Sequence, residues 1–181
     1  MPNPGLGTRL RADTRGAGLE DERRAADAAG EEHVMDVQTT RFGVIEIAED
    51  RVITFPSGLL GFPGRTRYCL LEPGEDACFL WLQSLDDPAL AFVLTDPSLF
   101  VPDYSAPIHP AQMDELGLSS LLDSQVFVIV NKVDQTLTGN LQGPLVINVR
   151  SRVGVQLVLA EKRWTTRHVL AAIGPQAGSH N

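Results

Sequence analysis

The stretch FLWLQSLDDPALAFVLTDP, residues 79–97, consists of two apolar runs separated by a short polar corner. Both runs are rich in aromatic and β-branched residues, which suit a pleated, half-buried surface, and each is shorter than a typical helix. Pro88 cannot donate a hydrogen bond to a strand ladder, and aspartates next to it favour a turn. The stretch therefore predicts two antiparallel strands joined by a tight corner.

Comparable apolar runs lie on both sides of this stretch and extend the pattern. Further strands are predicted at residues 37–47, 51–55, 66–72, 125–133, 143–148 and 153–161. The clearest helix pattern is residues 109–118, where Pro110 suits the first helical position and Gly117 ends the helix. A second short helix is predicted after Thr165 or Thr166, which would cap it.

These elements predict an all-β, mostly antiparallel fold, a small barrel-like single domain with one or two short helices. A barrel is favoured because closure removes exposed sheet edges. Residues 1–35 are predicted to be a disordered tail because they contain few large apolar groups, residues 36–173 to be the folded domain, and residues 174–181 to be a flexible tail.

Composition limits the class of protein. The net charge of −8 argues against direct nucleic-acid binding, no apolar run is long enough to span a membrane, and the start of the chain lacks the apolar core of a signal peptide. The two cysteines, Cys69 and Cys78, lie in strand-like runs and are interpreted as small core residues rather than a redox pair. A cytoplasmic monomer is expected.

The charge is unevenly distributed along the chain. Residues 36–123 carry 14 acidic and 4 basic residues, whereas residues 124–181 carry 2 acidic and 6 basic ones. An acidic surface could steer the protein toward a basic partner, and the alternative is a surface that only maintains solubility.

No set of residues predicts catalysis, a metal site or a bound cofactor. Asp86 and Asp87 are neighbours, so on a strand they would point to opposite faces, and a structural turn is the favoured interpretation over an acid–base pair. The four histidines lack metal-ligand spacing. We therefore expect a binding protein and not an enzyme.

Two proline-rich segments with large apolar residues are candidate contact loops. In residues 55–64, FPSGLLGFPG, packing against the core is favoured over exposure for binding. In residues 97–107, PSLFVPDYSAP, a binding loop and a strap over the barrel end are equally compatible with the sequence.

Four blocks together resemble the family of flagellar assembly factor FliW: FPSGLLGFPG, FLWLQSLDDPALAFVLTDPSLFVPDY, VFVIVNKV followed by TGNLQGPLVIN, and GVQLVLAEKRWTTRH. The resemblance covers about residues 40–170, and the block with Asp86 is its most specific part. It departs from the family pattern in the segment before the domain and in Trp164, where the family has tyrosine.

The resemblance implies a small, barrel-like cytoplasmic protein without enzyme activity. Such a protein binds and antagonises CsrA, a dimeric RNA-binding repressor of flagellin translation, and it also binds flagellin, so that flagellin synthesis follows secretion. The expected contact residues are Asp86, Asp87, Phe100, Asp103 and Tyr104. The alternatives are a dedicated flagellin export chaperone without a CsrA role, a β-barrel enzyme, and a structural part of the flagellum.

Overall fold

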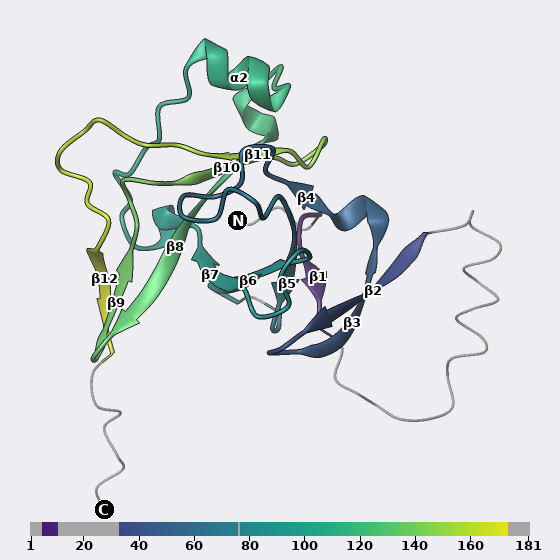
Figure 1. Ribbon diagram of the computed structural model, residues 1–181. Coiled ribbons are helices and arrows are strands. Elements are labelled where there is room, and N and C mark those ends of the chain that lie inside the picture. Colours follow the sequence, from purple (N-terminus) through teal and green to yellow (C-terminus); the bar gives the residue numbers. More distant parts are fainter. Residues whose placement is uncertain (1–4, 11–32, 76, 174–181) are drawn as a thin grey trace, which may run out of the picture.

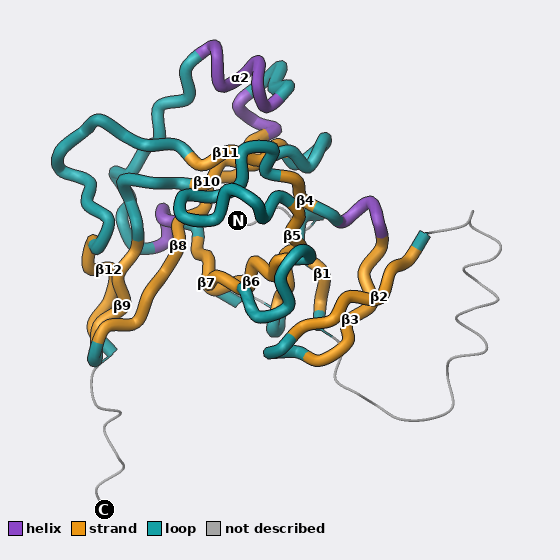
Figure 2. The backbone as a smooth tube through the Cα atoms, viewed as in Figure 1, coloured by secondary structure: helices purple, strands orange, loops and turns teal. Residues whose placement is uncertain are grey.

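The computed structural model describes residues 5–10, 33–75 and 77–173 (Figure 1). Strands dominate it, with one short α-helix and three single turns of 3-10 helix in the described part (Figure 2). The strands are β1 (Thr8–Arg9), β2 (Val34–Thr39), β3 (Gly43–Ala48), β4 (Ile53–Thr54), β5 (Arg67–Glu72), β6 (Phe79–Ser84), β7 (Ala91–Thr95), β8 (Ser124–Val133), β9 (Thr136–Gly139), β10 (Leu145–Asn148), β11 (Gly154–Gln156) and β12 (His168–Ala172). The helical elements are η1 (Glu49–Arg51), η2 (Pro97–Leu99), α2 (Pro110–Leu116) and η3 (Leu121–Asp123).

The main sheet closes on itself. Strands β5, β6, β7, β8, β10 and β11 are neighbours in that order, and every pair is antiparallel. The residue before β11, Val153, forms a bridge with Thr54 of β4, and β4 pairs with β5. Figure 1 shows these strands arranged as a ring. The predicted all-β, barrel-like fold is confirmed.

The barrel interior is a single apolar cluster formed by side chains that alternate along the strands. Tyr68 and Leu70 point inward from β5, and Leu82 and Leu94 point inward from β6 and β7. Phe55 is completely buried and lies edge-on to Tyr68, with ring centroids 5.6 Å apart. This packing fixes the register of the strands, because a slip by one residue would turn each side chain to the opposite face.

Two smaller clusters cover the outer faces of the barrel. The β2–β3 hairpin packs Val37, Ile45 and Ile47 against Cys69 and Leu71 on the outside of β5. On the opposite wall, Val128 of β8 and Val146 of β10 pack with Leu116 of α2 and with Trp164 in a second cluster. The helix forms where the sequence predicts it, with Pro110 in the first turn and Gly117 in the left-handed conformation at its end, φ 64°.

The C-terminal helix predicted after Thr165 or Thr166 is wrong. Residues His168–Ala172 form strand β12, which pairs with β9, and β9 pairs with the far end of β8. Together they form an arm that extends from the barrel wall (Figure 1). Pairing with an otherwise open edge overrides the weak local helix preference of the sequence.

The prediction of a disordered segment over residues 1–35 is wrong for residues 5–10 and 33–35. Strand β1 pairs in parallel with β5, and Leu6 is 3% exposed within the barrel cluster. Residues 1–4 and 11–32 lie outside the described residues, as does the predicted tail at 174–181. The prediction rested on the average composition of the segment, which is poor in large apolar groups. It therefore did not indicate that two leucines, Leu6 and Leu10, pack against the domain.

Two further expectations need correction. Residues 37–47 are not one strand but most of the β2–β3 hairpin, because the chain turns at residues 40–42 and enters β3 at Gly43, φ 70°. Cys69 is a buried core residue as predicted, whereas Cys78, which directly precedes β6, is exposed, so its predicted core position is wrong. The remaining runs form strands near their predicted places, although the run at 153–161 is a strand only over Gly154–Gln156.

Candidate protein-binding surfaces

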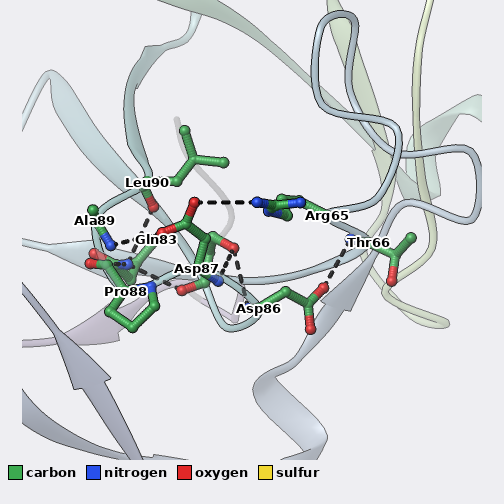
Figure 3. A network of polar contacts seen from close by, with 9 residues as sticks. Arg65, Thr66, Gln83, Asp86, Asp87, Pro88, Ala89 and Leu90 are labelled. Carbon is green, nitrogen blue, oxygen red and sulfur yellow. Dashed lines mark hydrogen bonds and ion pairs between the residues drawn. The ribbon is translucent and has the colours of Figure 1, made fainter.

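The corner between β6 and β7 is a hydrogen-bonded turn that holds Asp86 in place (Figure 3). One oxygen of Asp86, Oδ2, accepts from the backbone N–H groups of Thr66 at 2.9 Å and of Arg67 at 3.1 Å. The other, Oδ1, accepts from the Arg67 guanidinium at 3.1 and 3.2 Å. Asp86 therefore ties the corner to the beginning of β5.

The same contacts set the ionisation of Asp86. Partial burial acts to raise the pKa of its carboxyl, but the hydrogen bonds from Thr66 and Arg67 and the charge of Arg67 outweigh it and lower the pKa. The Asp86 carboxyl is therefore held in its charged form at the surface corner.

Asp87 faces Arg65 and is less constrained. Its Oδ1 accepts from the N–H of Ala89 at 3.0 Å, an Asx turn, and its Oδ2 lies 3.6 Å from the Arg65 guanidinium (Figure 3). Behind both aspartates, the Ser84 hydroxyl accepts from their backbone N–H groups at 3.1 and 3.0 Å. The buried Gln83 amide donates to the carbonyls of Ser84, Pro88 and Leu90. The geometry of the corner fits the favoured turn interpretation.

The other three predicted contact residues lie in the loop that follows β7. Phe100 stacks on Phe79, with ring centroids 5.9 Å apart, and is partly buried. The Asp103 side chain is 70% exposed and pairs with Arg163 at 3.4 Å. The Tyr104 hydroxyl donates to the Leu141 carbonyl at 2.7 Å, and its ring lies edge-on to Trp164 at 5.0 Å. Burial raises the pKa of Tyr104.

The structure does not bring the five predicted residues into one site. Asp86 and Asp87 precede β7, whereas Phe100, Asp103 and Tyr104 follow it, so the length of a five-residue strand, roughly 15 Å, separates the two groups. Within the loop, Tyr104 straps the segment to the barrel wall, and Asp103 is the member with the most accessible side chain. The Tyr104 contacts fit the interpretation of a strap over the barrel, and a binding role of the loop stays a prediction.

An acidic face that the sequence did not reveal lies on the β2–β3 hairpin. Asp36 and Glu46 sit directly opposite each other in the antiparallel register and are both exposed. Glu49 and Asp50 follow in η1 and are exposed as well. Among the described residues, none of these four carboxylates forms a salt bridge. The signal was missed because residues 37–47 were interpreted as one strand, which leaves Asp36 and Glu46 far apart.

Part of the charge asymmetry along the sequence is neutralised within the fold. Arg150 binds Asp123 at 2.9 Å, and Arg163 binds Asp103, so two basic residues of the last third pair with acidic residues of the first two thirds. Asp86 and Asp87 at the β6–β7 corner also pair with arginines, so the exposed acids without a salt bridge among the described residues include the hairpin group but not this corner.

The apolar loop 55–64 is partly packed and partly exposed. Leu59 is 3% exposed, as expected for packing, whereas Leu60 is 61% exposed. Gly58 has φ 69°, and a Cβ there would lie 2.5 Å from the Phe62 carbonyl oxygen, so the turn requires glycine. The loop, β11 and Glu115 of α2 line a shallow cavity of about 260 Å³. Another leucine, Leu122 of η3, is 93% exposed.

Residues 5–10, 33–75 and 77–173 contain neither a cluster of metal-ligating side chains nor a membrane-spanning helix. Within these ranges no group of three or more histidine, cysteine, aspartate or glutamate side chains is arranged to hold a metal ion. No helix in the same ranges is long and apolar enough to cross a membrane.

Comparisons with known proteins agree with the fold and name a family. The profile of the FliW protein family matches residues 36–170. The flagellar assembly factor FliW of Alkaliphilus metalliredigens is 40% identical over 139 residues, which are 75% of this chain and 86% of that protein. The flagellar assembly factor FliW of Heliobacterium modesticaldum is 41% identical over 138 residues, which are 75% of this chain and 90% of that protein. A crystal structure of a flagellar assembly factor FliW superposes with a TM-score of 0.70 at 33% identity, covering 75% of this chain and 96% of the solved one.

Proposed function

The chain belongs to the FliW family of flagellar assembly factors, and on this premise we propose that it binds and antagonises CsrA and also binds flagellin. Binding to CsrA relieves repression of flagellin translation. Flagellin that accumulates in the cytoplasm occupies the protein, releases CsrA and restores repression. The protein acts as a cytoplasmic monomer, without catalytic activity, and couples flagellin synthesis to flagellin secretion.

The family match over most of the chain is the observation that carries this proposal. Charge adds physical support, because CsrA binds RNA and a protein that binds phosphates presents basic groups. The carboxylates of Asp36, Glu46 and Glu49 form no salt bridge among the described residues. Asp50 interacts electrostatically with Arg152 and is exposed like the other three, so all four are accessible to a basic surface. Exposed acidic groups of this kind accelerate association with a basic partner more than they strengthen the final complex.

Exposed apolar side chains support binding of a second protein, flagellin, by apolar contacts. Leu60, Leu99 and Leu122 are all more than half exposed, and Phe100 is held in place by its stack on Phe79. A preordered aromatic or leucine side chain loses little conformational freedom on binding, which makes it an effective anchor. We propose that flagellin uses apolar contacts of this kind.

Isothermal titration of the purified protein with CsrA, repeated after saturation with flagellin, tests the proposal directly. Heat of binding that flagellin abolishes is the expected result. Binding to flagellin alone would instead identify a dedicated export chaperone, and the translational role would be dropped. Heat with neither protein would contradict both functions.

Matched charge variants test which acidic surface faces CsrA. The double variant Asp36→Asn/Glu46→Gln should lower the association rate about threefold to tenfold at low salt and flatten its dependence on ionic strength. The corner variant Asp86→Asn/Asp87→Asn is the comparison. If the corner variant alone changes the salt dependence, the partner binds at the corner and not at the hairpin. If binding and its salt dependence survive in the corner variant, the corner is structural.

A further inference from the structure

Strand β1 lies outside the part of the chain that the family shares. The family profile begins at residue 36, and 75% of this chain accounts for 96% of the solved relative. Residues 5–10 nevertheless dock on the domain, with Thr8 and Arg9 in parallel register with Leu71 and Glu72. The part of the chain that the family profile covers therefore offers a sheet edge, called the β5 groove below, that residues 5–10 fill.

The groove lies on the outer edge of β5. Strand β4 pairs with the first half of that edge, at Arg67 and Tyr68, and β1 pairs with the second half. The N–H of Leu10 donates to the Glu72 carbonyl at 3.1 Å and extends the pairing by one residue. Addition of an extended segment to a free sheet edge is a common way for proteins to bind peptides.

Side chains at the groove select the sequence of the segment. Leu6 belongs to the barrel cluster, which also contains Ile53, Phe55 and Leu59, and is 3% exposed. Leu10 packs in the hairpin cluster on the outside of β5. The Glu72 side chain lies across Gly7, where a Cβ would be 2.2 Å from its carboxylate, so a larger residue at this position would displace Glu72. The groove therefore recognises a leucine followed by a small residue.

Two arginines of the shared domain bind the backbone of the same segment. Arg51 donates to the Gly5 carbonyl at 2.6 Å, and Arg152 donates to the carbonyls of Gly5 and Leu6. Arg152 adopts φ 59°, a conformation that is uncommon for a residue with a side chain. Contacts to backbone carbonyls are independent of side-chain identity. The two arginines would therefore bind any extended segment whose leucine fits the position that Leu6 occupies in the barrel cluster.

We propose that the β5 edge is a docking groove for an extended Leu-Gly segment of a partner protein, and that residues 5–10 occupy it as an intramolecular competitor. The occupant is tethered to the domain through residues 11–32 and pairs with only two positions of β5, so its hold depends on the tether as well as on its contacts. A second copy of this chain would bring the same contacts without the tether. A partner segment with a longer paired stretch gains contacts that β1 lacks, which favours a partner over exchange between copies.

A labelled peptide with the sequence NPGLGTRLRA, residues 3–12, tests the groove in the full-length chain by fluorescence anisotropy. The variant Leu6→Ala removes the buried side chain of the competitor and should bind the peptide at least about tenfold more tightly than the unchanged chain. Arg9→Ala is the matched control on the same strand, because the Arg9 side chain is 68% exposed and its ion pair among the described residues is with the exposed Glu75. It should behave like the unchanged chain.

A second variant and a second measurement keep the test decisive. Gly7→Val displaces the competitor by a different route and should give the same gain. Hydrogen exchange of residues 67–72 should accelerate in both variants and slow again when the peptide is added. No peptide binding to either folded variant would overturn the proposal and make β1 a permanent strand. A reciprocal dimer in light scattering would assign the groove to a second copy and also overturn it. Neither result depends on binding to CsrA or flagellin.

Discussion

At the scale of single residues, the corner aspartates illustrate how one residue type serves two purposes. Asp86 accepts four hydrogen bonds from Thr66 and Arg67 and is held as a carboxylate, whereas Asp87 accepts one backbone hydrogen bond and faces a loosely placed Arg65. The contribution of Asp86 to stability should therefore exceed that of its neighbour, although the two are adjacent in sequence and equally charged.

Replacement of Asp86 by asparagine should reduce the free energy of unfolding by about 1–3 kcal/mol at neutral pH, because one acceptor oxygen is replaced by a donor facing N–H groups. Asp87→Asn should change it by less than about 0.5 kcal/mol, since asparagine also forms the Asx turn. Urea unfolding of both variants measures the difference. Equal losses would contradict the assignment of Asp86 as the structural member.

The lowered pKa of Asp86 gives the same comparison a pH dependence. A carboxyl whose pKa is lower in the folded protein adds stability above its unfolded pKa of about 4, and this stability is lost as the pH falls toward the folded pKa. The difference in the free energy of unfolding between the unchanged chain and Asp86→Asn should thus be constant from pH 7 to about pH 5 and become smaller below about pH 4. A gap that widens in acid would be incompatible with this direction.

At the scale of elements, the barrel closes through short contacts that tolerate little change. Thr54 bridges to Val153 and also donates its N–H to the Arg152 carbonyl at 2.9 Å. Gly154 follows immediately, and Phe55 lies against its Cα hydrogens. The closure thus depends on a glycine at a position where the buried ring approaches the backbone.

Gly154→Ala should lower the free energy of unfolding by about 1–3 kcal/mol, because the added Cβ would lie 2.5 Å from a ring carbon of the completely buried Phe55. Gly64→Ala is the control, since no atom lies within 4 Å of the corresponding Cβ. Thermal unfolding of both variants tests this. A Gly154→Ala chain as stable as the control would mean that Phe55 moves at little cost.

The β2–β3 hairpin places two carboxylates in direct cross-strand opposition. Like charges at opposed positions destabilise a sheet, so Asp36→Asn/Glu46→Gln should raise the free energy of unfolding by about 0.2–1 kcal/mol. Denaturant unfolding at low and high salt measures the gain, which should be larger at low salt. A gain in stability together with slower CsrA association would show that this repulsion is retained for binding. A destabilised variant would contradict the opposition of the two charges.

At the scale of the whole molecule, sequence patterns predict the fold where local signals suffice. The meander over 66–96 and the helix between Pro110 and Gly117 follow from apolar runs, turn residues and caps. The remaining elements depend on distant partners: β12 exists because β9 offers an edge, and β1 because β5 does. The hairpin turn carries no Asn-Gly signal and is held by Thr39, whose hydroxyl bonds to Gly43 and Phe42.

The sequence indicated which kinds of residue are candidate contacts and in which segments they occur, but it did not indicate how these residues are arranged in space. Proline-rich loops with aromatic and acidic residues identify the right segments, but their separation by β7 is a property of the sheet. Exposure of individual leucines is likewise set by packing: Leu59 and Leu60 are adjacent, and one is buried while the other faces solvent. Periodicity cannot separate them, because the loop has no regular period.

The two thiols provide a probe of how the β2–β3 hairpin opens from the barrel. Cys78 is exposed, whereas Cys69 lies under the β2–β3 hairpin, and its burial raises the pKa of the thiol to about 12. Titration of the native protein with a thiol reagent should modify one cysteine rapidly and the second at the rate at which the hairpin leaves β5. Peptide mapping should locate the fast site at Cys78. Two equally fast thiols would contradict the packing of the hairpin.

The order of the strands also has a consequence for synthesis on the ribosome. The barrel is complete once β11 and its bridge to β4 have emerged, whereas β9 waits for β12, which is made roughly one to three seconds later at typical elongation rates. A nascent chain can thus close its barrel while one edge of the arm is still unpaired. Translation that stalls in this interval should leave a folded barrel whose open edge is the natural contact for a chaperone.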